Sequence, residues 1–109
     1  MAVTCMESDR CLRASISGEL DHHHAKQIMM ELDRQIDAAM PRRLVLDLGE
    51  LTFSDSSGIA VLLRTQRKMQ HLGGSILVCQ VPRQAKRVLD AAGIGRLITI
   101  QAGGTENEK

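Results

Sequence analysis

Aromatic residues are almost absent from this chain. Its 109 residues include one phenylalanine, Phe53, and neither tyrosine nor tryptophan. Proteins that bind single-stranded nucleic acid stack the bases on aromatic rings. The formal net charge of +1 also provides no broad positive field for a phosphate backbone. We therefore expect no nucleic acid among the partners of this protein.

Long hydrophobic runs and paired cysteines are lacking as well. No segment approaches the roughly 18 consecutive apolar residues of a membrane span, and the N-terminus lacks the basic region and apolar run of a signal peptide. The three cysteines, Cys5, Cys11 and Cys79, form no Cys-x-x-Cys pair, which suits reduced thiols. These features predict a cytoplasmic protein that does not bind membranes.

The remaining composition is that of one ordinary globular domain. The chain is 43% hydrophobic and 25% charged, and its length leaves no room for a second domain. We expect the domain to cover residues 1–100. The polar, glycine-containing tail, residues 101–109, is expected to be mobile.

Hydrophobic periodicity predicts strands that alternate with helices. Alternating or continuous apolar runs indicate strands at 2–8, 11–17, 44–48, 75–79 and 97–100. Apolar residues at three- and four-residue steps indicate helices at 22–40, at about 55–71 and from Pro82 to Gly93. Asp21 is placed to cap the first helix, and Gly73-Gly74 to end the second.

This order of elements predicts an α/β fold. Strands separated by helices form parallel crossovers, whereas the first two strands are close enough for an antiparallel hairpin. We expect a mixed, mostly parallel β-sheet packed against several α-helices. Gly18 is expected to end the second strand, and the segment 49–54 is expected to be a loop.

The segment Asp55-Ser56-Ser57-Gly58 carries the main candidate for chemistry. It follows a buried strand and starts a helix, a place where α/β proteins bind ligands and partners. Asp and Ser are also preferred helix caps, so the segment has a purely structural interpretation. A phosphoserine is compatible with the same position, because a helix N-terminus stabilises negative charge. The local sequence leaves both interpretations open.

Three motifs in the right order resemble a known family. They are Gly18-Glu19-Leu20-Asp21-His22-His23, Leu51-Thr52-Phe53-Ser54-Asp55-Ser56-Ser57-Gly58 and His71-Leu72-Gly73-Gly74. Together they are similar to the anti-sigma factor antagonists of spore-forming bacteria, which are single STAS domains (the sulfate transporter and anti-sigma antagonist fold). The likeness covers about residues 3–100 and is strongest to antagonists that act on sigma F in sporulation.

This resemblance implies a switch controlled by phosphorylation. The unphosphorylated antagonist would bind the anti-sigma factor, an ATP-dependent serine kinase, and release the sigma factor. Phosphorylation on Ser56 would inactivate it, and a metal-dependent serine/threonine phosphatase would restore it. The protein would be the substrate of a kinase and not itself an enzyme, a monomer when free, with no cofactor. The partner-binding residues would be Asp21, His22, Ser54, Asp55, Ser57 and Gly58.

Departures from the family pattern leave other functions open. His24, Ser54 and Ala60 replace the residues usual in close relatives, near the presumed interface. The first alternative is therefore a STAS regulator in a different partner-switching pathway, of stress response or signalling. The second is a module that senses a small molecule or anion at the loop around Ser56.

Two other candidate sites are less favoured. Adjacent residues on a helix point about 100° apart, so His22, His23 and His24 cannot all face one metal ion, and no further Cys or His is spaced to help. We expect no metal there. Asp47, at a strand end, lacks the neighbouring carboxylates of a metal-assisted phosphoacceptor and is expected to be a solvated or capping residue.

Overall fold

A mixed six-stranded sheet forms the centre of the computed structural model, which describes residues 2–102. The elements follow one another as β1 (Ala2–Ser8), β2 (Cys11–Leu20), α1 (His22–Ala39), β3 (Arg43–Asp47), β4 (Leu51–Ser54), α2 (Ser57–His71), β5 (Ser75–Val81), α3 (Arg83–Ala91), a 3-10 turn (Ile94–Arg96) and β6 (Thr99–Ala102). The strand order is β1-β2-β3-β5-β6, and β4 pairs with β2. All pairs except β1 with β2 are parallel, so the predicted α/β fold is confirmed.

The first two strands form the expected hairpin. Asp9 and Arg10 have φ values of 50° and 63°, the left-handed pair of a two-residue turn that matches the twist of the strands. Strand β2, however, does not end at Gly18 as the sequence predicts. Gly18 has a φ of 90° and marks a register shift, after which β2 continues to Leu20. A residue without a side chain adopts this conformation at little cost.

The segment 51–54 is a strand and not a loop, which corrects the sequence prediction. Beyond Gly18, β2 has left its partner β3 and pairs with β4 instead. Thr52 and Phe53 are exposed, whereas Leu51 and Ser54 are buried. This burial pattern does not alternate, so the usual period-two signal of a strand is missing.

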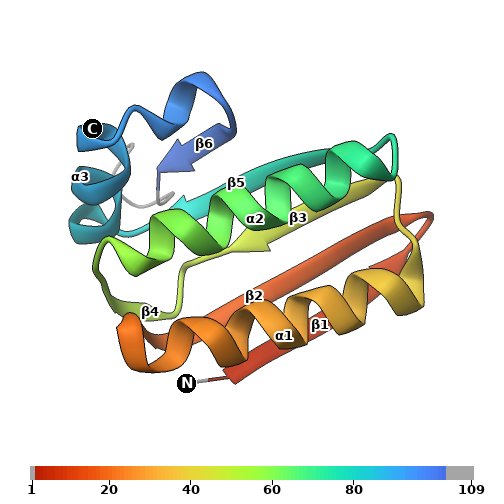
Figure 1. Cartoon of the computed structure of the whole chain (residues 1–109), viewed down its shortest axis with the longest axis horizontal. Helices are drawn as coiled ribbons and strands as arrows, with labels where there is room; N and C mark the ends of the chain where they lie inside the picture. Colours follow the sequence, from red (N-terminus) through yellow and green to blue (C-terminus); the bar gives the residue numbers. More distant parts are fainter. Residues whose placement is uncertain (1, 103–109) are drawn as a thin grey trace.

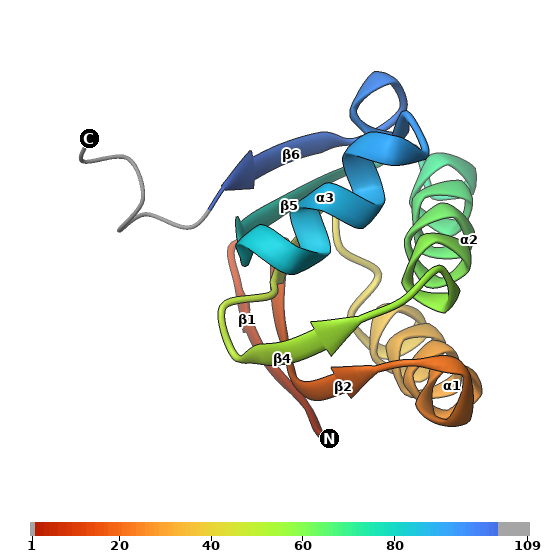
Figure 2. The same ribbon diagram turned by 90° about the vertical axis from the view of Figure 1, so that its left-hand side faces the viewer.

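Helices α1 and α2 lie side by side on one face of the sheet (Figures 1 and 2). Helix α1 buries Ala25, Ile28, Leu32 and Ile36, within the predicted stripe. In α2 the fully buried residues are Gly58, Val61, Leu62, Thr65 and Met69. Of the predicted α2 stripe, Ile59, Leu63 and Gln66 are only half-buried, with Ile59 and Leu63 packed against the edge of the core.

The helix ends follow simple backbone rules. Asp21 caps α1 at its start, as predicted, and Met40 ends it in the left-handed conformation just before Pro41. Gly73, with a φ of 74°, ends α2, and the Gly74 N–H donates to the carbonyl of Met69. The last strand is shifted from its predicted position to Thr99–Ala102, because a 3-10 turn at Ile94–Arg96 occupies the chain before it. Strand β6 thus includes the first two residues of the predicted tail, and residues 103–109 lie outside the described residues.

The central strand provides a test of the core. Leu46 in β3 is fully buried, whereas Met30 in α1 is 62% exposed. We expect Leu46→Ala to lower the free energy of unfolding by about 3 kcal/mol, through lost burial and a residual cavity. Met30→Ala, the matched control, should change it by less than about 0.5 kcal/mol. Urea unfolding followed by circular dichroism measures both values, and equal costs would contradict this core.

Candidate functional site

The carboxyl ends of two parallel strands meet at the candidate site. Strand β2 ends at Leu20 and leads into α1, and β4 ends at Ser54 and leads into α2 (Figure 2). The Asp55 N–H donates to the Leu20 carbonyl over 3.2 Å. The structure therefore brings Asp21 and His22 beside the segment 54–58, as expected for parallel strands that end at one edge.

Asp55, and not Ser56, caps helix α2 through its side chain. The Asp55 Oδ1 atom accepts a hydrogen bond from the Ser57 N–H at 2.7 Å. Ser56 occupies the N-cap position but its side chain makes no capping hydrogen bond, and the residue is exposed. The capping interpretation thus applies to Asp55, while the Ser56 hydroxyl stays accessible at a helix N-terminus.

Two predicted partner-binding residues are buried. Ser54 is 3% exposed, and its backbone N–H and carbonyl both bond the side-chain amide of Gln84 in α3. Gly58 is buried against it, and a Cβ built on Gly58 would lie 2.5 Å from Ser54 Oγ. These two residues therefore set the shape of the turn and offer little surface to a partner.

Asp21 is held by a neighbouring histidine. Its Oδ1 atom accepts from the His24 backbone N–H at 3.1 Å and lies 2.7 Å from His24 Nδ1. Desolvation raises the pKa of Asp21, but the hydrogen bonds and charge of His24 outweigh it, so the pKa lies below its ordinary value. The carboxylate that starts α1 is thus kept ionised.

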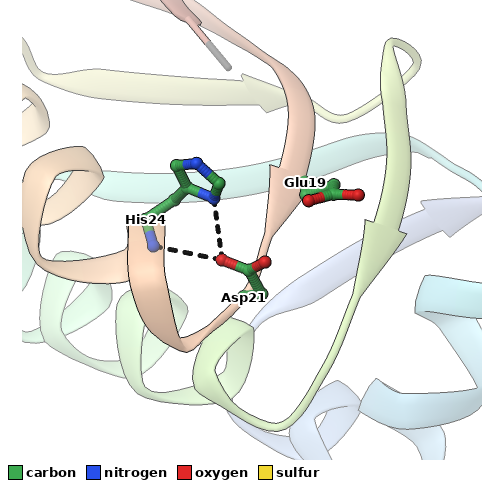
Figure 3. Close-up of side chains that lie close together, drawn as sticks. All are labelled: Glu19, Asp21 and His24. Carbon is green, nitrogen blue, oxygen red and sulfur yellow. Dashed lines mark hydrogen bonds and ion pairs between the residues drawn. The ribbon is translucent and has the colours of Figure 1, made fainter.

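Glu19 completes a group of possible metal ligands that the sequence did not suggest. One ligand atom each of Glu19, Asp21 and His24 lies within 4.8 Å of the others (Figure 3). The prediction of no metal here rested on the absence of a further Cys or His, whereas the additional ligand atoms belong to carboxylates around the preceding strand end. Two carboxylates and an imidazole are ligands for a divalent cation, although Asp21 Oδ1 already serves His24 and the helix cap.

A shallow apolar groove of about 320 Å³ lies between the first turns of α1 and α2. It is lined by His22, Ala25, Lys26, Met29, Ser57 and Ala60. Phe53, the chain's single aromatic residue, is 42% exposed on β4 and pairs in register with Glu19. The groove was not predicted, although three of its lining residues, His22, Ser57 and Ala60, had been placed at or near the interface from the sequence. Phe53 was not assigned to the interface, although an exposed aromatic residue directly before a candidate loop is a usable signal.

Asp47 and two basic residues of α2 have structural partners. Asp47 accepts from Arg13 at 2.7 Å and from the Gly49 N–H at 2.8 Å, which confirms a capping residue at the strand end. Arg64 and Lys68 pair with Asp33 and Asp37 of α1. Among residues 2–102, no helix is long and apolar enough to cross a membrane.

Comparison with known proteins places this α/β domain in a family. The STAS domain model matches residues 3–106. The anti-sigma F factor antagonist of Paenibacillus polymyxa is 36% identical over 85 residues, which cover 78% of this chain and 73% of that protein. The chain belongs to the STAS domain family and, within it, to the anti-sigma factor antagonists. The anti-sigma F factor antagonist of Lysinibacillus sphaericus is 28% identical over 78 residues, which cover 72% of this chain and 67% of that protein.

Solved structures show the same fold. The anti-sigma factor antagonist SpoIIAA in its unphosphorylated form aligns with a TM-score of 0.78 at 24% identity, over 96% of this chain and 91% of that one. An anti-sigma factor antagonist from Mycobacterium paratuberculosis aligns with a TM-score of 0.83 at 22% identity, over 96% and 88%. At these identities the likeness concerns the fold alone.

The close approach at Gly58 can be tested by adding one methyl group. Gly58→Ala would place a carbon 2.5 Å from Ser54 Oγ and 3.1 Å from Leu20 Cδ2, so we expect a loss of about 1–3 kcal/mol in unfolding free energy. Gly95→Ala, with no atom within 4 Å of the new carbon, is the control. Adding Ser54→Ala should recover part of the loss. Denaturant titration of the variants would contradict the contact if Gly58→Ala and Gly95→Ala were alike.

The Asp21–His24 contact predicts a pH dependence of stability. A carboxyl whose pKa is lowered by folding stabilises the native state above its unfolded pKa, and this contribution disappears as pH falls through the folded pKa. Asp21→Asn keeps a capping side chain but removes the charge. We expect the variant to melt at a lower temperature than the parent at pH 7 and the difference to shrink towards pH 3. A difference independent of pH would contradict this role of the charge.

Proposed function

We propose that this protein is a partner-switching antagonist whose surface around Ser56 binds an anti-sigma factor until Ser56 is phosphorylated. The observation that carries the proposal is the division of roles between Asp55 and Ser56. Asp55 supplies the side-chain cap of α2, so the exposed Ser56 hydroxyl is free to react without loss of that cap. The family membership and the name of the Paenibacillus relative support the same function.

The chemistry needs only an accessible hydroxyl on this chain. Ser56 Oγ attacks the γ-phosphorus of ATP bound to the anti-sigma kinase, ADP leaves, and the hydroxyl proton passes to a base of the kinase. A serine/threonine phosphatase later hydrolyses the ester with water, which returns the hydroxyl and releases inorganic phosphate. The N-terminus of α2 tolerates the product, because its dipole and N–H groups favour negative charge.

The partner-binding surface consists of the exposed and half-buried residues around this hydroxyl. We assign to it Asp21, His22, Asp55 and Ser57, with the α1–α2 groove and Phe53 beside them. Ser54 and Gly58 are buried beneath this surface and pack against each other, which sets the shape of the turn. A phosphoryl group would add about −1.5 to −2 charges at the middle of this surface, and a close-fitting partner would have to desolvate them.

The sigma factor released by this antagonist is proposed to be sigma F. The names of the Paenibacillus and Lysinibacillus relatives support this assignment. The alternative is a different partner-switching pathway, favoured by His24 and Ala60, because both depart from the family pattern and Ala60 lines the groove. Transcription assays with sigma F and with the other sigma factors of the same genome, each inhibited by its own anti-sigma factor, would separate the two.

Substitutions at the two adjacent serines test the switch. After incubation with ATP and each anti-sigma kinase encoded in the same genome, we expect mass spectrometry to find phosphate on Ser56 in the parent and in Ser57→Ala. Ser56→Ala should carry none but bind the kinase within about threefold of the parent, because no capping bond is lost. Ser56→Asp should bind at least about tenfold more weakly, because it adds a charge to the interface.

The parent is the reference for every variant, and Ser57→Ala is the control for loss of the hydroxyl next to Ser56. A phosphate on Ser57, or no phosphate with any of these kinases, would refute the proposed switch. Circular dichroism melts should show Ser56→Asp folded, since a carboxylate is favourable at a helix N-terminus.

A further inference from the structure

The last residue of β4 is held from two sides. On one side β4 pairs with β2, and the Asp55 N–H donates to the Leu20 carbonyl. On the other side stands α3 (Figures 1 and 2). The side-chain amide of Gln84, in the first turn of α3, accepts from the Ser54 N–H at 2.8 Å and donates to the Ser54 carbonyl at 2.7 Å. It thus bonds the same two backbone groups that a neighbouring strand would bond.

The side chain of Gln84 is not part of the hydrophobic core. The residue is exposed, and α3 is anchored by the buried side chains of Ala85 and Leu89. The start of α3 has its own backbone bond, from the Lys86 N–H to the Pro82 carbonyl at 2.8 Å. The two hydrogen bonds of Gln84 therefore act on Ser54 more than on α3.

A movement of Ser54 would reach Ser56 over a very short path. Ser54 is two residues before Ser56, and its Oγ atom packs against Gly58 in the first turn of α2. Asp55, between Ser54 and Ser56, provides the side-chain cap of α2. Fixing the backbone of Ser54 consequently fixes the turn that presents the Ser56 hydroxyl.

We propose that Gln84 is a positioning residue that holds the turn 54–57 in the conformation read by the anti-sigma kinase. This inference rests on the proposed function of Ser56. A four-residue strand paired on one side by a backbone ladder has little local stability to spare. Without the Gln84 bonds, other conformations of the turn become populated, and the fraction competent to bind the kinase falls.

Amide hydrogen exchange at Ser54 tests the first half of the proposal without any partner. The Ser54 N–H is protected by Gln84 Oε1, so Gln84→Ala should lower its protection factor by about tenfold. Core amides such as that of Leu46 should be unchanged. Gln70→Ala, an exposed glutamine elsewhere on a helix, is the matched control and should leave Ser54 unaffected.

Gln84→Glu adds a readout that a purely structural role would not give. A neutral carboxyl both accepts and donates, as the amide does, whereas a carboxylate only accepts and would face the Ser54 carbonyl with like charge. Protection of Ser54 in this variant should therefore rise as the pH falls below about 4, near the ordinary pKa of a glutamate. No such rise is expected in Gln84→Ala.

Phosphorylation kinetics test the second half. With the kinase that phosphorylates the parent, Gln84→Ala should raise KM at least about threefold with kcat within about twofold, because only the competent fraction binds. Unchanged protection of Ser54 in Gln84→Ala would overturn the proposal, and so would lowered protection with unchanged KM. Absence of phosphate on Ser56 in the parent would instead refute the proposed function, and the exchange experiment would still decide whether Gln84 holds the turn.

Discussion

The site exists because β2 has two successive parallel partners. Its first half pairs with β3, and after the kink at Gly18 its last residues pair with β4. Carboxyl ends of parallel strands lie at the same edge of a sheet, so the helices that follow β2 and β4 start beside each other. The bond from the Asp55 N–H to the Leu20 carbonyl ties the two strand ends together. This pairing places Asp21, at the start of α1, beside the turn that carries Ser56.

An aspartate side chain caps the start of each of the two helices at the site. Asp21 caps α1 and Asp55 caps α2, each with an Oδ1 atom that accepts a backbone N–H. Exposed N–H groups and the helix dipole favour such carboxylates. Because the aspartate side chains accept the free N–H groups at the helix starts, the side chains of His22 and Ser56 are not needed as caps, and both residues are exposed. The region combines a well-anchored backbone with chemically available side chains.

Signals that are local in sequence predicted most of the fold. Asp21 before an apolar helical stripe and Gly73 after another were enough to place the ends of two helices. The sequence does not predict strand β4, because Thr52 and Phe53 are both exposed and break the alternation. It predicts a strand end at Gly18, whereas β2 shifts register there and continues. These errors have one cause. Whether a short segment without alternation becomes a strand depends on whether the edge of another strand, distant in the sequence, is available to pair with it.

The sequence locates the candidate segment but not the contacts that hold it in place. The motif around Ser56 and the resemblance to a family identified the segment, and helix-capping preferences could not say which residue caps. The roles of Ser54 and Gln84 depend on contacts across 30 residues. A polar side chain that bonds a backbone far away leaves no periodic pattern, so sequence alone contains no signal for it.

The modest size of the surface suits the proposed switch, in which one phosphoryl group on Ser56 abolishes binding of the anti-sigma factor. The groove is shallow and apolar, and Phe53 adds one partly exposed ring, so the apolar area available for binding is modest. Binding of this kind leaves little free energy in excess once association entropy is subtracted. Desolvating a doubly charged group at the centre costs several kcal/mol, and about 1.4 kcal/mol is a tenfold change in affinity. A larger, more hydrophobic interface would absorb that cost, and the proposed switch would then fail. The scarcity of aromatic residues in this chain therefore suits a contact that must be reversible.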